Sequence, residues 1–183
     1  LGGQSFQKAK ARVRRQVRKM ADELLRLYAE RASLRKQPLP RPDDDYSTFE
    51  ASFPYEETRD QALAIDDVMR DLSSERVMDR LICGDVGFGK TEVALRAAFR
   101  NALAGRQTAL LCPTTVLAQQ HYLTFAGRLE GYPITVHALS RFQSRAEQQE
   151  TLKGLKSGSV DIVIGTHRLL SKDVTFQRLG LLV

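Results

Sequence analysis

The 183-residue sequence contains no tryptophan, two cysteines and three histidines. Two cysteines cannot form a disulfide framework, and because Cys83 and Cys112 each end a short apolar run, we expect both to be reduced thiols in a core. No apolar run approaches the roughly 20 residues that a transmembrane helix needs, and the N-terminal residues lack the apolar region of a signal peptide. The sequence therefore disfavours secreted and membrane-spanning classes, and its scattered histidines disfavour a metal site built on them.

Charge is distributed unevenly along the chain. The net charge of +6 combines +9 over residues 1–42, −8 over residues 43–80 and +5 over residues 81–183. Such asymmetry is typical of proteins that contact a polyanion, but solvated helix faces produce the same statistics. Charge alone therefore leaves nucleic-acid binding and a solvated surface as open alternatives.

The N-terminal region carries the pattern of one long helix. Residues 5–36 contain neither glycine nor proline, and apolar residues recur every three or four positions, at Phe6, Ala9, Val13, Val17, Met20, Leu24 and Leu27. This spacing predicts a helix with a narrow apolar stripe. Such a helix cannot form a domain alone, so we expect it to lie on its own chain or on a partner. Its basic residues either contact DNA or form a solvated face of a linker, and we favour the linker.

Three prolines, Pro38, Pro40 and Pro42, end this pattern and precede the acidic run Asp43–Asp45. Proline cannot continue a helix and restricts the residue before it, so this stretch predicts a solvated linker. We therefore divide the chain into a basic linker helix with a Pro-rich linker, residues 1–42, and one domain, residues 43–183.

Helical and strand patterns alternate through the domain. The predicted helices are those from Thr58 to Leu72, 90–104 with Gly105 as the cap, 116–129 and 144–156, and the predicted strands are 81–83, 108–112, 134–139, 160–164 and 179–183. Strands that are continuous apolar runs separated by helices are typical of a parallel sheet covered on both faces. The predicted fold class is therefore α/β, a three-layer sandwich with a parallel sheet, preceded by the long N-terminal helix.

One segment matches the phosphate-binding pattern G-x-x-x-x-G-K-[ST]. It reads Gly84-Asp85-Val86-Gly87-Phe88-Gly89-Lys90-Thr91 and lies between a predicted strand and a predicted helix. The glycines allow backbone amides to surround phosphate oxygens, and the positive end of the helix points at the same anion. Lys90 is expected to reach the β- and γ-phosphates and the Thr91 hydroxyl to ligate Mg²⁺. The sequence therefore predicts a nucleoside triphosphate site.

The residues around this loop indicate which nucleobase the site would bind. A guanine reader of the form Asn-Lys-x-Asp is missing, since Asn101 is the only asparagine. Upstream, Thr58 and Gln61 fit a capping box of a helix N-terminus. The Gln61 amide also matches the donor and acceptor of adenine, with Phe53 or Tyr55 as an apolar face. The two interpretations of Gln61 stay open and are compatible.

At this point the motifs resemble a known family. The segments Phe53–Gln61, GDVGFGKTEVA from Gly84, PTTVLAQQH from Pro113, Ser140-Arg141-Phe142 and IGTHRLL from Ile164 occur in the order of a superfamily 2 motor. The combination is most similar to the bacterial transcription-repair coupling factors, and next to the RecG-type fork helicases. The resemblance covers nearly the whole chain and implies a RecA-like P-loop domain, the first motor domain of a DNA translocase.

The resemblance also implies roles for individual residues. Nucleotide contacts would come from Phe53, Tyr55, Gln61 and the segment Gly84–Glu92, with Lys90 and Thr91 as catalytic residues and Thr91 on Mg²⁺. Contacts with DNA phosphates would come from Pro113, Thr114, Thr115, Ser140, Arg141, Thr166, His167 and Arg168. Hydroxyls and an arginine at the ends of parallel strands suit phosphate contacts that ignore sequence. Thr114 and Thr115 also suit a helix N-cap, an alternative that stays open.

A carboxylate that would hold Mg²⁺ at a strand end is missing from the pattern. Asp161 lies at the start of its strand, and the final run Gly180–Val183 stops where the resemblance would place the Walker B motif. We therefore expect a fragment that ends before Walker B and that binds ATP without hydrolysing it.

The function expected for the whole protein is an ATP-dependent double-stranded DNA translocase of transcription-coupled repair. It would displace stalled RNA polymerase in the bacterial cytoplasm, with RNA polymerase and nucleotide-excision repair proteins bound through other regions. A fork-remodelling helicase and a non-catalytic module that docks protein or DNA are the alternatives. A small-molecule kinase is disfavoured because the chain shows no substrate lid.

Overall fold

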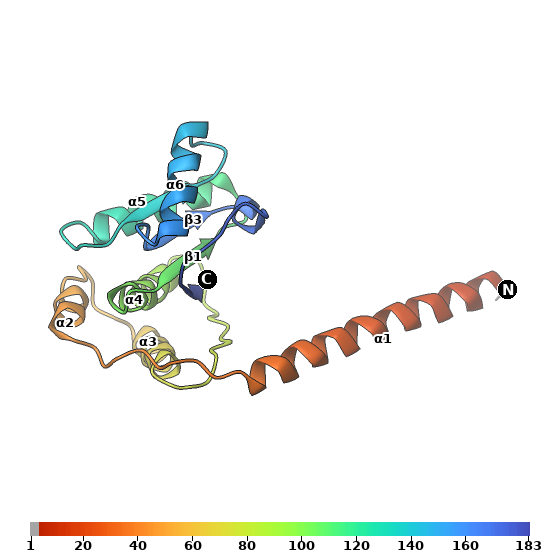
Figure 1. Cartoon of the computed structure of the whole chain (residues 1–183). Helices are drawn as coiled ribbons and strands as arrows, with labels where there is room; N and C mark the ends of the chain where they lie inside the picture. Colours follow the sequence, from red (N-terminus) through yellow and green to blue (C-terminus); the bar gives the residue numbers. More distant parts are fainter. Residues whose placement is uncertain (1–3) are drawn as a thin grey trace.

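The computed structural model describes residues 4–183, so the first three residues of the predicted linker lie outside the described part. Four strands form one sheet in the order β2-β3-β1-β4, and all three neighbouring pairs are parallel (Figure 1). They are β1 (Gln107–Leu111), β2 (Val136–Leu139), β3 (Ile162–Gly165) and β4 (Leu179–Leu182). Each lies within or beside a predicted apolar run.

The described chain also forms six α-helices, four of which precede β1, and one 3-10 helix. They are α1 (Gln4–Ser33), α2 (Asp44–Ala51), α3 (Arg59–Leu72), α4 (Lys90–Leu103), α5 (Thr115–Arg128), α6 (Arg145–Ser157) and η1 (His167–Leu170). The predicted helix starts are confirmed at α3 and α6, where Thr58 with Gln61 and Ser144 with Glu147 form capping boxes. Hydrogen bonds from Ser144 lower the pKa of the Glu147 carboxyl, as expected for a carboxylate at a helix N-terminus.

Helices cover both faces of the sheet. On one face, Leu110 and Ile164 pack with residues of α4 and α5, among them Phe99 and Phe125. On the other face, Val163 and its neighbours Ala109 and Leu139 pack with Leu155 of α6 and Leu169 of η1. Successive side chains of a strand point to opposite faces, so one run of apolar residues serves two cores. The predicted three-layer α/β fold is confirmed.

The stretch predicted as a solvated linker is partly structured. Asp43 accepts a hydrogen bond from the backbone N–H of Tyr46 and so begins α2, whose Tyr46 and Phe49 are buried. Burial raises the pKa of Tyr46 to about 12. The three aspartates are exposed, as predicted, but the prediction of a linker is wrong at this point because Asp43 is a helix N-cap and Asp44 and Asp45 form the first turn of α2.

The residues before α2 pack on α3 and α4. Leu39 is buried, and Lys36 donates hydrogen bonds to the carbonyls of Leu72 and Ser74 at the end of α3, both at 2.7 Å. Burial lowers the pKa of Lys36, and two arginines nearby act in the same direction. Arg100 of α4 donates a 2.7 Å hydrogen bond to the Pro40 carbonyl. The Pro-rich segment therefore follows the surface of the domain.

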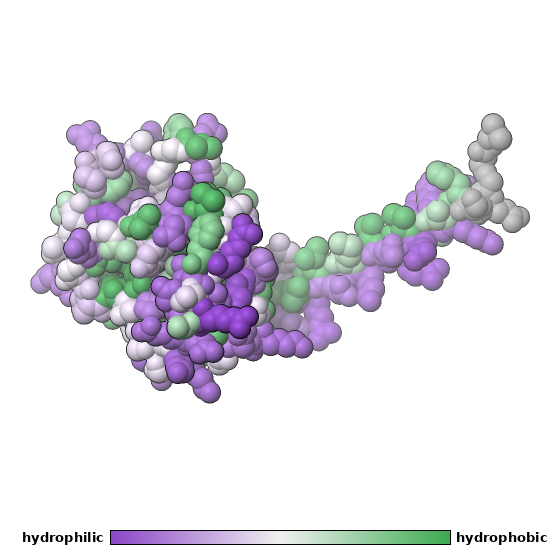
Figure 2. All heavy atoms as spheres, turned by 90° about the horizontal axis from the view of Figure 1, so that it is seen from above, coloured by the Kyte–Doolittle hydropathy of each residue, from purple (hydrophilic) through white to green (hydrophobic). Residues whose placement is uncertain are grey.

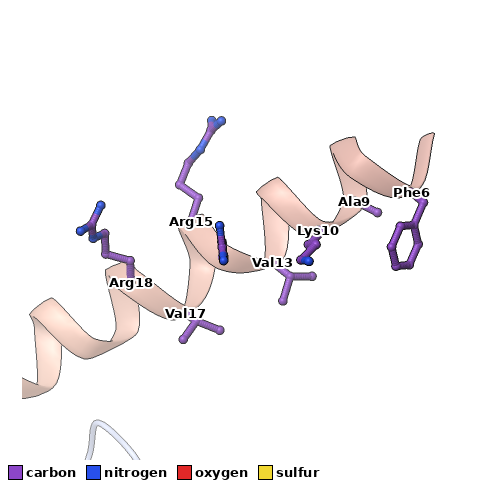
Figure 3. Close-up of a pocket in the computed structure, with 8 residues that line it drawn as sticks. Phe6, Ala9, Lys10, Val13, Arg15, Val17 and Arg18 are labelled. Carbon is purple, nitrogen blue, oxygen red and sulfur yellow. The ribbon is translucent and has the colours of Figure 1, made fainter. Parts of the chain in front are cut away.

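Helix α1 extends away from the other elements (Figure 1). Its apolar residues lie along one side and its basic residues along another, as Figure 2 shows for the whole helix. In the close-up of Figure 3, Phe6, Val13 and Val17 point to one side, whereas Arg15 and Arg18 point to the other. The apolar stripe is exposed, with Met20 62% and Leu24 53% accessible. Of the two expected alternatives, packing on its own chain is not seen in the described residues, and packing on a partner stays a prediction.

The predicted strand 81–83 is absent, although these residues lie within the described part of the chain. The segment forms no backbone hydrogen bond with a described strand, and Leu81 is 85% exposed. A strand needs a neighbour to pair with, and a three-residue apolar run does not specify one. The expectation for Cys83 is wrong for the same reason, since it is exposed. Cys112 is buried as expected, and burial raises the pKa of its thiol.

In the described residues, no helix is both long and apolar enough to cross a lipid bilayer.

Candidate functional site

The loop Gly84–Gly89 leads directly into α4. Gly87 and Gly89 have φ angles of 86° and 68°, a conformation that side chains disfavour, and Gly89 is the residue that precedes the helix. No side chain caps the helix N-terminus, so its first N–H groups are left for another acceptor. Uncapped amides behind a glycine turn fit an anion such as a phosphate group.

Lys90 lies folded over this loop. Its ammonium donates hydrogen bonds to the carbonyls of Gly84 at 2.5 Å and Asp85 at 2.6 Å. The positive charge of Lys90 is therefore held beside the glycine turn. Thr91, the next residue, lines a neighbouring cleft. The predicted phosphate-binding and Mg²⁺-binding residues are thus brought together at the start of α4.

Gln61 makes contacts that join residues Phe53–Gln61, called the base segment below, to the loop. Its side-chain oxygen accepts from the Thr58 N–H at 2.8 Å, and its amide nitrogen donates to the Phe88 carbonyl at 3.1 Å. A Cβ added at Gly89 would collide with the Gln61 amide. The capping role of Gln61 is confirmed, and its predicted contact with adenine stays a prediction.

A cleft of about 700 Å³ lies between the base segment and the loop. Nine of the predicted nucleotide residues line it, namely Phe53, Tyr55, Gln61, Val86, Gly87, Phe88, Gly89, Thr91 and Glu92. Gly84 and Lys90 line a smaller adjoining hollow, whereas Asp85 lines neither. Thr124 and Arg128 of α5 also line the cleft, and sequence reasoning missed both because nothing near them matches a motif.

An ionic cluster centred on the buried Arg96 adjoins this cleft, which two of its members, Glu92 and Arg128, line. Arg96 of α4 is fully buried and donates to Glu50 at 2.8 Å, Glu57 at 2.5 Å and Glu92 at 3.0 Å. Although burial lowers the pKa of Arg96, hydrogen bonds to Glu92 and Glu57 raise it overall, so the guanidinium stays charged. Arg128 donates to the same Glu92 oxygen at 3.0 Å. The cluster thus joins α2, the base segment, α4 and α5.

A second hollow, of about 450 Å³, lies where three parallel strands end. All eight residues predicted to contact DNA line it, together with Gln148 of α6: Pro113, Thr114, Thr115, Ser140, Arg141, Thr166, His167 and Arg168. They meet because the last residues of β1 and β2, Leu111 and Leu139, are both in register with Gly165 of β3. The carboxyl ends of parallel strands share one edge of a sheet.

The polar side chains of this hollow differ in their hydrogen-bond partners. Thr114 caps α5 by accepting the Leu117 N–H at 3.2 Å, which confirms the capping alternative for this residue. Ser140 is buried and bonded to Gln143 at 2.8 Å. Arg168 forms two hydrogen bonds with Asp173, which lower the pKa of that carboxyl. Within the described residues Arg141 has no hydrogen bond or ion pair, so its charge is available to a ligand.

A family model for DEAD/DEAH box helicases matches residues 58–183, which include the glycine loop and all residues that line the second hollow, whereas Phe53 and Tyr55 of the first cleft precede the matched range. The chain belongs to this family. Membership of this family implies that the domain binds a nucleotide.

Relatives extend the similarity over the whole chain. The transcription-repair-coupling factor of Bacillus subtilis (strain 168) is 53% identical over all 183 residues, and that of Staphylococcus haemolyticus (strain JCSC1435) is 51% identical. The chain spans 16% of the length of these curated relatives. The resemblance to coupling factors stated from the motifs is confirmed by these identities.

A solved structure shares the fold. It is titled "Structure of RecG bound to three-way DNA junction", is 37% identical and superposes with a TM-score of 0.79. The similarity covers 86% of this chain and 22% of that one. The RecA-like interpretation of the sheet and its helices is therefore confirmed.

Proposed function

We propose that the helicase domain binds ATP with Mg²⁺ in the cleft between the base segment and the glycine loop. The observation that carries this is the uncapped N-terminus of α4 behind Gly87 and Gly89, with the Lys90 ammonium at its mouth. Loop amides and Lys90 would hold the phosphates, the Thr91 hydroxyl would ligate Mg²⁺, and Gln61 with Phe53 would face the base. Bound Mg²⁺ would neutralise part of the negative charge of the phosphates.

Within the described residues, no carboxylate directly follows β1, β2 or β3. Within this chain, the Thr91 hydroxyl is the ligand that we propose for Mg²⁺, and we expect the 183-residue chain to bind ATP without turning it over.

We further propose that the hollow at the strand ends grips the phosphate backbone of double-stranded DNA. Backbone amides, hydroxyls and the unpaired guanidinium of Arg141 supply donors without reading bases. A basic groove of this kind binds many sequences and weakens with salt.

For the whole protein, we propose an ATP-dependent double-stranded DNA translocase of transcription-coupled repair in the bacterial cytoplasm. It would displace stalled RNA polymerase and cooperate with nucleotide-excision repair proteins through regions outside this chain. The 53% identity over all 183 residues to a coupling factor supports this over a fork-remodelling helicase, for which the RecG similarity is 37%. A non-catalytic docking module would leave the glycine loop and its lysine without a role.

Gln61 tests the base contact separately from the phosphate contacts. We expect Gln61→Ala to weaken ATP binding about tenfold, because one to two hydrogen bonds with the base are lost, and to change tripolyphosphate binding by less than about twofold. Isothermal titration of both ligands measures the difference. Gln61→Glu is the matched control for the capping box, because glutamate keeps the acceptor for the Thr58 N–H but lacks the amide donor. Equal losses for both ligands would contradict the base contact.

Arg141 tests the DNA contact. We expect Arg141→Ala to weaken binding of duplexes of unrelated sequence by a similar factor and to reduce the slope of log affinity against log salt by about one. Fluorescence anisotropy over a salt series measures both quantities. Lys156→Ala removes the same charge from the far end of α6, eight residues beyond Gln148, and should leave the slope unchanged. A loss confined to one DNA sequence, or an equal effect of both variants, would rule out the backbone contact.

A further inference from the structure

Arg128, the last residue of α5, forms part of the cleft wall. One nitrogen of its guanidinium donates to Glu92 at 3.0 Å, and another donates to the carbonyl and hydroxyl of Ser52 at 3.2 and 2.8 Å. Its side chain is 18% exposed. Arg128 therefore joins α5 to the helix that follows the glycine loop and to the residue at which α2 ends.

The same guanidinium lies against two aromatic rings. Its central carbon is 4.6 Å from the ring centroid of Phe49 and 5.6 Å from that of Phe53. Arg96 lies 5.5 Å from the Phe53 ring, so two cations flank this ring. Phe49 is fully buried, whereas Phe53 lines the cleft. Arg128 thus connects the Phe53 ring to a buried core residue.

The segment that carries Phe53 has no regular structure between α2 and Thr58. Besides one backbone hydrogen bond, from the Phe53 N–H to the Glu50 carbonyl at 3.2 Å, side-chain contacts hold this segment, namely Glu57 with Arg96 and the Arg128 contacts with Ser52 and Phe53. The contacts of Arg128 with Ser52 and with Phe53 use different parts of its flat, forked guanidinium group. A lysine has one compact charge and cannot make them together, so the geometry requires arginine.

We infer that Arg128 is a positioning residue of the base pocket: it holds the Phe53 ring where a nucleobase stacks and keeps the Glu92 carboxylate turned towards the ionic cluster. The inference rests on the proposed binding of ATP in this cleft. Arg128 acts through Phe53, so its removal weakens the contact with the base and leaves the contacts with the phosphates in place.

The test compares ATP with tripolyphosphate, which carries the phosphates without a base. We expect Arg128→Lys and Arg128→Gln each to weaken ATP binding about tenfold and tripolyphosphate binding by less than about twofold, since stacking on an aromatic ring supplies an effect of this order. Phe53→Ala should weaken ATP to a similar degree. Because Arg128 acts through Phe53, Arg128→Gln should have little further effect in the Phe53→Ala background.

Controls separate this role from a loss of structure and from failure of the proposed function. Arg80 pairs with Asp67 and Asp71 away from the cleft, so Arg80→Gln should leave both affinities unchanged. If the unaltered chain binds neither ligand, the proposed function fails. If it binds both, but the Arg128 variants bind ATP normally, lose both ligands equally, or add their full effect to Phe53→Ala, the proposed function stands and the role of Arg128 is refuted.

Discussion

We expect the Lys90→Ala variant to lose the rise in melting temperature that ATP produces in the unaltered chain. At an ATP concentration about one hundred times the Kd, binding stabilises a protein by about 2.7 kcal/mol. For a chain of this size that corresponds to a shift of roughly 5–10 °C. The variant removes the only side-chain cation that touches the carbonyls of Gly84 and Asp85 in the described structure. Without it, the loop amides alone face the charge of three phosphates.

Thermal unfolding with Mg²⁺ and increasing ATP measures this effect, and GTP in place of ATP tests the base. Lys153→Ala, on the exposed side of α6, removes the same charge and should keep the full shift. A Lys90→Ala variant that ATP stabilises as strongly as the unaltered chain would show that the glycine loop does not bind the triphosphate. The interpretation of the cleft would then fail, whatever the second hollow binds.

The second large effect is expected for Arg96→Met, and it concerns stability. Arg96 is fully buried, whereas the side chains of Glu92, Glu57 and Glu50 are 8%, 30% and 45% exposed. Breaking a buried ion pair from one side costs about 3–5 kcal/mol, and we expect a loss at the lower end, about 3 kcal/mol, because water screens the two exposed carboxylates that lose their partner. Glu92 keeps Arg128, whereas Glu50 and Glu57 are left without a cation in the structure as described. We expect a decrease in melting temperature of roughly 10 °C.

Urea unfolding of Arg96→Met beside the unaltered chain measures the change in free energy. Arg80→Met is the matched control, because Arg80 also bridges two carboxylates, but on a solvated surface where ion pairs contribute little. Replacing Glu50 and Glu57 by glutamine in the Arg96→Met background should restore part of the loss, since it removes the uncompensated charges. Equal destabilisation by Arg96→Met and Arg80→Met would show that burial of the cluster is not what makes Arg96 important.

Local patterns predicted much of this molecule correctly. The capping residues Thr58 and Ser144 lie within three positions of their partners, and the glycine loop is a contiguous segment. The meeting of Thr114, Ser140 and Thr166 also followed from sequence order. Each comes just after a strand, and parallel strands bring their carboxyl ends to one edge. Information of this kind is contained in a few neighbouring residues or in the period of an apolar run.

The errors have a common cause. The apolar run at Leu81 has the residue types of a strand, but a strand forms only where a neighbouring strand pairs with it, and the run itself does not specify that neighbour. Asp43 is a residue type that is common in loops, yet its carboxylate accepts a hydrogen bond from the N–H of Tyr46. In both places the outcome depends on a hydrogen-bonding partner, which composition does not report.

The order of the residues alone predicted a parallel α/β domain of a helicase with a triphosphate loop and a row of phosphate donors, because period, caps and motifs act over short distances. The ionic cluster beside the cleft required the folded chain. Glu50, Glu57, Arg96 and Arg128 come from four separate segments, and no spacing along the sequence indicates that they meet. Charges that are far apart in sequence interact only after packing has brought them together and excluded water.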